Sequence, residues 1–173
     1  MKQIALDIGV ASLPSFANFF AGPNEVALRH LELWAGNNLR SPVRTYLWGA
    51  PGSGKTHLLT AVAETLREQG ARTGWLDASV LEPPAFDDSW AGVILDDCHL
   101  YTAVQQQAAF NWFVNALSSA DGHPRWVLAA GNLPPADLVL RDDLRSRLGW
   151  GHVFELHALT ETERRAVLRR EAD

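Results

Sequence analysis

The chain has 173 residues, with 15 basic and 20 acidic side chains and a net charge of −5. This length fits one domain with a filled core. Hydrophobic residues make up 47% of the chain, which excludes a disordered protein, and no apolar run approaches the length of a membrane span. The negative charge argues against general electrostatic attraction to DNA or membranes. We therefore expect neither membrane association nor direct sequence-specific DNA binding.

The first residues and the single cysteine indicate where the protein works. The segment from Met1 to Asp7 has one lysine followed by an aspartate, where a signal peptide needs an apolar run. Cys98 has no second cysteine with which to pair, which fits a reducing cytoplasm. Residues 1–15 lack a clear period, so we expect an extended arm with the folded domain beginning after it.

Hydrophobic periodicity predicts helices that alternate with strands along the rest of the chain. The predicted helices span 24–35, 55–69, 105–117, 137–148 and 160 to the end, and the predicted strands span 44–48, 73–76, 91–97, 126–130 and 152–156. Asn24 is the expected N-cap of the first helix, and Thr160 with Glu163 forms a capping-box pattern at the last. This alternation predicts an α/β fold with a five-stranded parallel sheet flanked by helices.

A Gly-rich motif between the first strand and the second helix has the pattern of a phosphate-binding loop. Its residues are Gly49, Ala50, Pro51, Gly52, Ser53, Gly54, Lys55 and Thr56. Successive backbone N–H groups at such a loop, followed by a helix N-terminus, bind phosphate oxygens. Lys55 is expected at the β and γ phosphates and the Thr56 hydroxyl at a magnesium ion, with ADP or ATP as the ligand. The next residue, His57, joins these nucleotide-binding candidates.

Polar residues at the ends of two later strands complete the predicted site. Asp96 is expected to hold Mg²⁺ through its hydration shell, and Asp97 to orient or deprotonate the attacking water. The alternative is a turn that ends the strand. Asn132 follows the fourth strand, where a side chain can reach the γ-phosphate or the water. Residues 131–135 are equally suited to a plain turn, and the sequence leaves both interpretations open. His99 is interpreted as a structural histidine.

Three arginines lie within seven residues near the end of the chain. Arg141 and Arg145 are four residues apart and share a face of the predicted helix, whereas Arg147 points elsewhere. The alternative is a set of surface arginines that pair with Asp142 or Asp143.

Together these motifs resemble the AAA+ ATPases of the DnaA group, and more narrowly the Hda family of DnaA-homologous regulators, which inactivate the bacterial replication initiator. The resemblance covers almost the whole chain. Its matching segments are 16–19, 22–24, 49–58, 94–99, 132–135 and 144–151. It implies an AAA+ P-loop NTPase core.

The resemblance also implies roles for individual residues. Arg147 looks like the arginine finger that enters a neighbouring subunit's ATP site, where a planar guanidinium suits the charge on a transferring phosphoryl group. Arg145 is expected at the same partner surface. Residues 16–24, which include Phe16 and Phe19, look like the segment that lies against the adenine in the family.

The N-terminal arm resembles a second known element, the peptide with which bacterial proteins dock on the replicative sliding clamp. Its pattern is Gln3, Leu6 and Ile8. Gln3 would hydrogen-bond at a pocket rim while Leu6 and Ile8 fill an apolar groove, in an extended-peptide mode of recognition. The alternative is an amphipathic N-terminus without this partner.

The sequence departs from the family pattern in two places. Asp97 stands where other AAA+ proteins commonly have Glu, and the chain ends at Asp173, where the helical lid should begin. We therefore expect an arm at 1–15, an AAA+ nucleotide-binding domain at 16–159 and, at 160–173, the start of a helix leading to a missing lid. Intrinsic ATP hydrolysis is expected to be weak.

These features predict an adenine-nucleotide-binding regulator of bacterial chromosome replication initiation. The expected partners are DnaA and the sliding clamp, the β subunit of DNA polymerase III. The protein would stimulate hydrolysis of DnaA-bound ATP and would be cytoplasmic, reaching the nucleoid through the clamp. Assembly into a homo-oligomer stays open. So do two other functions: an AAA+ ATPase of helicase-loader or DnaA-initiator type, and a non-catalytic DnaA–clamp adaptor.

Overall fold

The computed structural model describes residues 13–36, 43–118 and 122–172. The helices are α2 (Glu25–Gly36), α3 (Lys55–Glu68), α4 (Ala103–Leu117), α5 (Asp142–Leu148) and α6 (Glu161–Ala172). The strands are β1 (Thr45–Trp48), β2 (Arg72–Leu76), β3 (Trp90–Leu95), β4 (Trp126–Gly131) and β5 (His152–Glu155). Three short 3₁₀ turns complete the fold: η1 (Gly22–Asn24), η2 (Cys98–Leu100) and η3 (Pro135–Asp137). Among these described residues, no helix is both long and apolar enough to cross a membrane.

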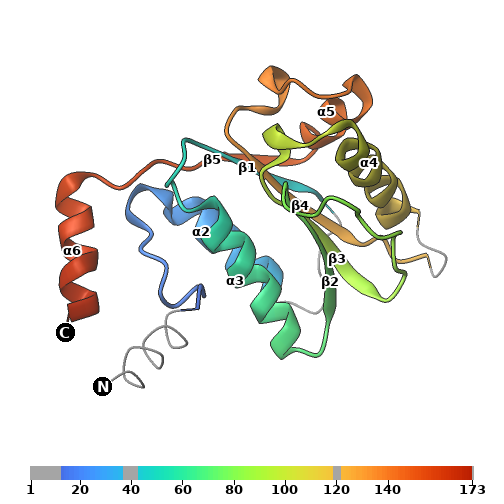
Figure 1. Cartoon of the computed structure of the whole chain (residues 1–173). Coiled ribbons are helices and arrows are strands. Elements are labelled where there is room, and N and C mark those ends of the chain that lie inside the picture. Colours follow the sequence, from blue (N-terminus) through green and yellow to red (C-terminus); the bar gives the residue numbers. More distant parts are fainter. Residues whose placement is uncertain (1–12, 37–42, 119–121, 173) are drawn as a thin grey trace.

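The five strands form one parallel sheet in the order β2-β3-β4-β1-β5. Helices α2 and α3 cover one face of this sheet, and α4 and α5 cover the other (Figure 1). Tyr46 packs into the core beneath α4 and α5, and the next residue, Leu47, into the core beneath α2 and α3. A strand covered on both faces is apolar at successive positions, which explains the continuous apolar runs of β3 and β4. The predicted α/β fold is confirmed.

The sheet brings together the carboxyl ends of three strands that carry polar residues. The backbone N–H of Gly49, after β1, donates to the carbonyl of Gly131 at the end of β4, with an N···O distance of 3.3 Å. The N–H of Asp96, after β3, donates to the carbonyl of Leu76 at 2.8 Å. Because all strands are parallel, these ends lie at one edge of the sheet.

The helix predicted at 137–148 is wrong in its first half. Residues 135–137 form η3, and α5 begins only at Asp142. Between them Leu138 and Leu140 are buried while Val139 is 92% exposed, an alternation with the period of an extended chain. Arg141 adopts an extended conformation just before α5. Arg141 therefore does not share a helix face with Arg145.

Capping interactions agree with the sequence at one helix and differ at two others. Thr160 and Glu163 exchange the two hydrogen bonds of a capping box at α6, as predicted. A second capping box, between Thr102 and Gln105, opens α4 and was not predicted. Asn24 is not a side-chain cap of α2. Its side chain instead donates to the carbonyl of His157 at 2.9 Å and accepts from the His157 N–H at 2.8 Å, which ties η1 to the segment after β5.

Candidate functional site

The Gly-rich loop connects β1 to α3 and depends on glycine at three positions. Gly52 and Gly54 have φ angles of +81° and +99°, a left-handed region that other residues rarely adopt. At Gly49 a Cβ atom would lie 2.4 Å from the carbonyl oxygen of Leu156. The loop conformation therefore follows directly from its glycines.

Lys55 begins α3 and turns its ammonium group back over the loop. Its Nζ donates to the carbonyls of Gly49 and Ala50, at 2.7 and 3.0 Å, and to the Ser53 hydroxyl at 3.3 Å. The side chain is only 7% exposed. Burial lowers the pKa of Lys55, while the charges of nearby acidic residues oppose that shift. These hydrogen bonds fix the ammonium group of Lys55 beside the Gly-rich loop.

Thr56 and Asp96 are brought into direct contact by α3 and β3. The Thr56 hydroxyl donates to Asp96 Oδ2 at 2.6 Å, and the Asp97 N–H donates to Asp96 Oδ1 at 2.9 Å. Asp96 is buried, and burial raises its pKa, with the hydrogen bond from Thr56 opposing the shift.

The oxygens of Thr56 and Asp96 have the chemistry that Mg²⁺ prefers. Magnesium sites in nucleotide-binding proteins use one or two carboxylates together with phosphate oxygens, rather than a cage made by the protein. In the described part of the chain, no three His, Cys, Asp or Glu side chains gather into a metal site. The residues present therefore fit a magnesium ion that is bound together with a nucleotide.

Asp97 has an unusual backbone conformation next to this pair. Its φ and ψ angles are +51° and +43°, the left-handed region. Such a conformation costs a non-glycine residue about 1–3 kcal/mol and is concentrated at functional sites. The turn that was the alternative interpretation is therefore present, and it also places Asp97 in the wall of a pocket beside Lys55 and Thr56.

Asn132 and His99 connect the ends of β4 and β3. The Asn132 N–H donates to His99 Nδ1 at 3.2 Å. The side-chain Oδ1 of Asn132 is buried and has no hydrogen-bond partner among the described residues. Buried polar atoms are nearly always paired, so this oxygen calls for an explanation such as a bound ligand or water. His99 acts as a structural acceptor.

Two pockets open on the Gly-rich loop. One, of about 370 Å³, is lined by Pro51, Gly52, Gly54, Lys55, Thr56, His57 and Asp97. The other, of about 220 Å³, is lined by Asn18, Phe19, Phe20, Asn24, Gly52, Ser53, Gly54, His57, Leu159 and Val167. They share Gly52, Gly54 and His57. The first pocket contains the ammonium of Lys55 and the hydroxyl of Thr56, which suit phosphates. The second contains aromatic and aliphatic side chains, Phe19, Phe20, Leu159 and Val167.

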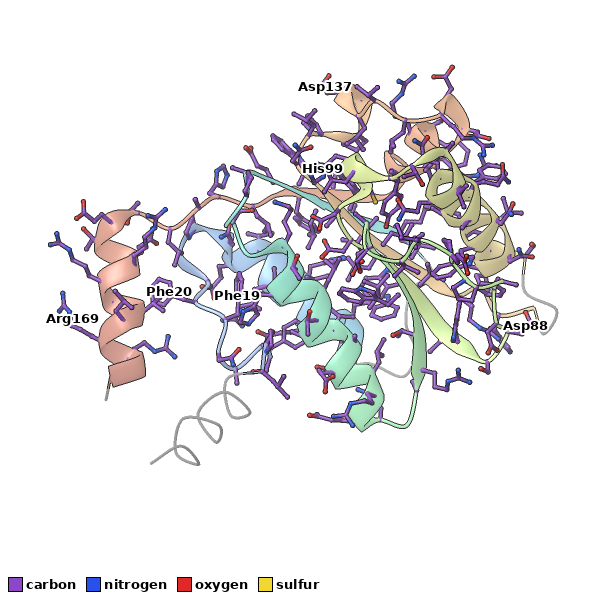
Figure 2. All side chains as sticks on the ribbon, in the orientation of Figure 1. Phe19, Phe20, Asp88, His99, Asp137 and Arg169 are labelled. Carbon is purple, nitrogen blue, oxygen red and sulfur yellow. The ribbon has the colours of Figure 1, made fainter. Side chains whose placement is uncertain are left out.

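The N-terminal segment forms one wall of the second pocket. Phe19 packs edge-on against His57, with ring centroids 5.3 Å apart, and His57 Nε2 lies 2.8 Å from the Ser15 carbonyl oxygen, which accepts its hydrogen bond. Phe20 lies towards α6, where Arg170 stacks over its ring (Figure 2). Phe16 packs on the core and does not line either pocket. Phe20 belongs to the segment expected against the adenine, whereas the contribution of α6 was not predicted.

The three clustered arginines differ in their partners. Arg141 forms a 2.7 Å salt bridge with Asp143, and Arg145 forms one with Asp142. Among the described residues Arg147 forms no salt bridge. Its Nη1 donates to the backbone carbonyl of Asp143 at 3.2 Å. The interpretation as paired surface arginines therefore fits Arg141 and Arg145 but not Arg147.

The position of α5 separates these arginines from the Gly-rich loop of the same chain. Helix α5 lies with α4 on the sheet face opposite α3 (Figure 1). Neither Arg145 nor Arg147 lines the two pockets described above. Gln3, Leu6 and Ile8 lie outside the described residues.

No model of a known protein family matches the chain. Domain III of the Thermotoga maritima replication initiation protein DnaA is similar in structure, with a TM-score of 0.75 and 21% identity over 92% of this chain and 73% of that chain. AMPPCP-bound DnaA from Aquifex aeolicus has a TM-score of 0.74 and 21% identity over 92% and 54%. DnaI has a TM-score of 0.60 and 15% identity over 84% and 88%.

The similarity covers only part of the larger of these proteins. This chain spans about half the length of the Aquifex aeolicus DnaA structure. The similarity is one of fold, a five-stranded parallel sheet with flanking helices. The chain therefore has the fold of the AAA+ P-loop NTPase core found in domain III of DnaA.

Proposed function

We propose that this protein is an adenine-nucleotide-binding regulator of bacterial chromosome replication initiation, of the Hda type. It would dock on the DNA-loaded sliding clamp through Gln3, Leu6 and Ile8 and stimulate hydrolysis of the ATP held by DnaA. It would act in the cytoplasm, at the nucleoid, where the clamp is loaded. One observation about Arg147 carries the proposal. Its guanidinium has no salt-bridge partner among the described residues, and it lies outside the pockets at the P-loop of its own chain.

The two joined pockets support the binding of an adenine nucleotide. The phosphates would lie in the pocket that holds Lys55, and the adenine would lie in the other, against Phe19. DnaA structures of the same fold bind AMPPCP, an ATP analogue. Thr56 and Asp96 would hold a magnesium ion, which neutralises charge on the phosphates when bound.

The remaining side chains of the site have separate tasks in this proposal. Lys55 already carries its ammonium above the loop carbonyls and would donate to the terminal phosphate oxygens. Asp97 would orient the attacking water, and the unpaired Oδ1 of Asn132 would accept a hydrogen bond from that water. Turnover at this site would be slow. The bound nucleotide would mainly stabilise the subunit for assembly with DnaA.

Arg147 would act on the ATP of the neighbouring subunit. A guanidinium already engaged by a carboxylate would have to break that salt bridge before it could bind a phosphate. Arg147 is instead held by a backbone carbonyl and by the faces of Phe110 and Trp150, with its guanidinium carbon 4.7 and 5.6 Å from the ring centroids. These contacts position the group without a salt bridge, and the carboxylate that its charge affects, Asp143, is already paired with Arg141.

The test measures hydrolysis of DnaA-bound ATP in the presence of DNA-loaded clamp. Arg147→Ala should reduce the stimulation by about 10³-fold or more, the lower range known for arginine fingers. Arg29→Ala is the matched control, because Arg29 is an exposed arginine paired with Glu25 on α2, and it should leave the stimulation unchanged. Full stimulation by Arg147→Ala would refute the finger assignment and favour a non-catalytic adaptor.

Clamp binding is tested separately from catalysis. The double substitution Gln3→Ala and Leu6→Ala should abolish co-purification with the clamp on DNA and leave the melting temperature unchanged. Retention of clamp binding by this variant would contradict the docking role of the arm.

A second candidate function is an AAA+ ATPase of the helicase-loader type. The similarity of this fold to DnaI supports it, as does the complete set of P-loop residues. Such a protein should hydrolyse ATP rapidly by itself, and Asp96→Asn should remove that activity. Slow hydrolysis that is unaffected by Asp96→Asn would favour the regulator.

A further inference from the structure

A fourth arginine, Arg44, lies beside Arg147 although the two are far apart in the sequence. The guanidinium carbon of Arg44 is 5.3 Å from the centroid of the Trp150 ring, and that of Arg147 is 5.6 Å from the same centroid. Two positively charged groups thus share one indole. Trp150 is half exposed, so a ligand can reach this place from solvent.

The backbone fixes Arg44 against the segment that carries Arg147. The His152 N–H donates to the Arg44 carbonyl at 2.9 Å, and Thr45 pairs with His152 in the sheet register. Gly151 has a φ angle of +116°, and a Cβ atom there would lie 2.4 Å from the Arg44 carbonyl oxygen. Only glycine permits this close approach, so the neighbourhood of the two arginines is set by the fold and not by flexible side chains alone.

The side chain of Arg44 points to the sheet face that α4 and α5 cover. Arg44 is two residues before Tyr46, whose side chain belongs to the core on that face, and alternate residues of a strand share a face. The Arg44 guanidinium carbon lies 5.4 Å from the ring centroid of Phe113 in α4. Aromatic rings therefore hold both arginines in place without neutralising them.

The electrostatic arrangement is unfavourable for the protein by itself. In the described ranges neither Arg44 nor Arg147 forms a salt bridge, whereas Arg141 and Arg145 each have one. The Nε atom of Arg44 is buried without a hydrogen-bond partner among the described residues. Burial, followed by the charge of Arg147, lowers the pKa of Arg44. Unpaired donors and like charges held together are typical of a site that binds an anion.

We infer that Arg44 and Arg147 form a paired-guanidinium site, seated on Trp150, for the phosphate chain of a nucleotide held by a neighbouring subunit. This inference rests on the proposed function for the identity of that subunit's nucleotide. Arg44 would be a second phosphate-contacting residue. Its planar fork can donate two hydrogen bonds to one phosphate group, and turning the side chain towards the phosphate gives the buried Nε an acceptor.

The shape and charge of the molecule favour a nucleotide over a nucleic-acid backbone. The guanidiniums of Arg44 and Arg147 converge on one indole, so they suit a compact polyanion. Arg141 shares the Phe110 ring with Arg147, but its charge is paired with Asp143. The net charge of −5 opposes the binding of a long polyanion.

The first experiment measures anion binding to this protein alone. The probe is inorganic tripolyphosphate, followed by the Nε–Hε signals of arginine in ¹H–¹⁵N spectra, in a Lys55→Ala background that weakens phosphate binding at the Gly-rich loop. The Arg44 and Arg147 signals should shift with a common Kd. Arg44→Gln and Arg147→Gln should each raise that Kd about tenfold or more, because a charge-assisted hydrogen bond is lost.

The control is Arg29→Gln, which removes an exposed arginine of α2 that has its own carboxylate partner and should leave the Kd within about twofold. Unchanged binding in Arg44→Gln, or an Arg44 signal that does not shift, would overturn the inference. Tighter binding of a single-stranded oligonucleotide than of tripolyphosphate, at equal charge, would also overturn it. Arg44→Lys retains the charge without the fork. A Kd for Arg44→Lys between those of the parent and Arg44→Gln, with an unchanged melting temperature, would exclude a merely structural role for Arg44.

The second experiment separates this inference from the proposed function. In the assay of DnaA-bound ATP, Arg44→Gln should lower the stimulation about tenfold, and less than Arg147→Ala does. If Arg147→Ala leaves hydrolysis unchanged while tripolyphosphate binding needs both arginines, the proposed function fails and the paired site stands. If Arg147→Ala abolishes stimulation while Arg44→Gln changes neither measurement, the inference alone fails.

Discussion

Asp96 illustrates how one side chain serves a site at the expense of stability. Its carboxylate is buried beside Thr56, and the neighbouring charge of Asp97 adds to the effect of burial on its pKa. The folded state therefore holds the Asp96 proton more tightly than the unfolded chain does. Protonated Asp96 therefore contributes to stability below its ordinary pKa of 3.8. This contribution is lost as the pH rises through the raised pKa of the folded state. At neutral pH the ionised group is unfavourable.

Asp96→Asn is therefore expected to stabilise the protein while it impairs the site. The uncharged amide keeps the volume and removes the buried charge, so the free energy of unfolding at pH 7 should increase by about 0.5–2 kcal/mol. Chemical denaturation at pH 7 measures this, with Asp88→Asn as the control, because Asp88 is exposed (Figure 2). A loss of stability in Asp96→Asn would mean that its two hydrogen bonds outweigh the cost of burying its charge.

At the level of elements, α2 and β5 meet through two histidines. The rings of His30 and His152 are 4.6 Å apart, and His30 also packs on Phe154 and lies 3.2 Å from the Thr45 hydroxyl. Burial, and then the charge of His152, lowers the pKa of His30 from its ordinary value of 6.5. The unfolded chain thus takes up this proton at a higher pH than the folded protein. The contribution of His30 to stability is present above pH 6.5 and is lost as the pH falls through the lowered value.

The contact between α2 and β5 should therefore weaken in acid. The melting temperature should fall between pH 7.5 and pH 5, and His30→Gln should make that fall smaller, because glutamine does not titrate. His152→Gln should also make it smaller, by removing the charge that opposes protonation of His30. An identical fall in the parent protein and in His30→Gln would place the acid sensitivity elsewhere.

At the level of the whole molecule, a nucleotide would connect parts that are distant in sequence. The two pockets include residues from the N-terminal segment, the Gly-rich loop, the end of β3 and α6. A ligand that binds the folded state with a concentration of 100 times its Kd stabilises it by about 2.7 kcal/mol. The whole domain should respond, because the Gly-rich loop joins β1, which contributes to both hydrophobic cores, to α3, which packs in one of them.

ADP with Mg²⁺ at 100 times its Kd should accordingly raise the melting temperature by about 5–11 °C. Lys55→Ala should remove most of this increase, since it deletes the ammonium that faces the phosphates. AMP, which lacks the β-phosphate, is the matched control ligand and should have little effect. An equal increase with AMP would indicate that the Gly-rich loop does not provide the main contacts.

The sequence by itself determined the features that depend on local chemistry. Alternating apolar segments specified a parallel α/β sheet, and the glycines at 52 and 54 specified the loop, because their positive φ angles are a local requirement. Asp96 was recognisable since an acidic residue that ends a buried strand requires a reason. The capping box at Thr160 was also readable from residues three positions apart.

Only the tertiary structure decided which of these residues meet and which charges stay unpaired. The strand order places β1 between β4 and β5, and this brings Arg44 to Trp150 and Arg147. The extended stretch from Leu138 to Arg141 was not predicted, because its two leucines are buried by the core around them and their spacing does not report whether the backbone is helical. Sequence patterns report neighbours along the chain, which include the salt-bridge partners of Arg141 and Arg145. Pocket walls and buried unpaired donors depend on neighbours across the sheet.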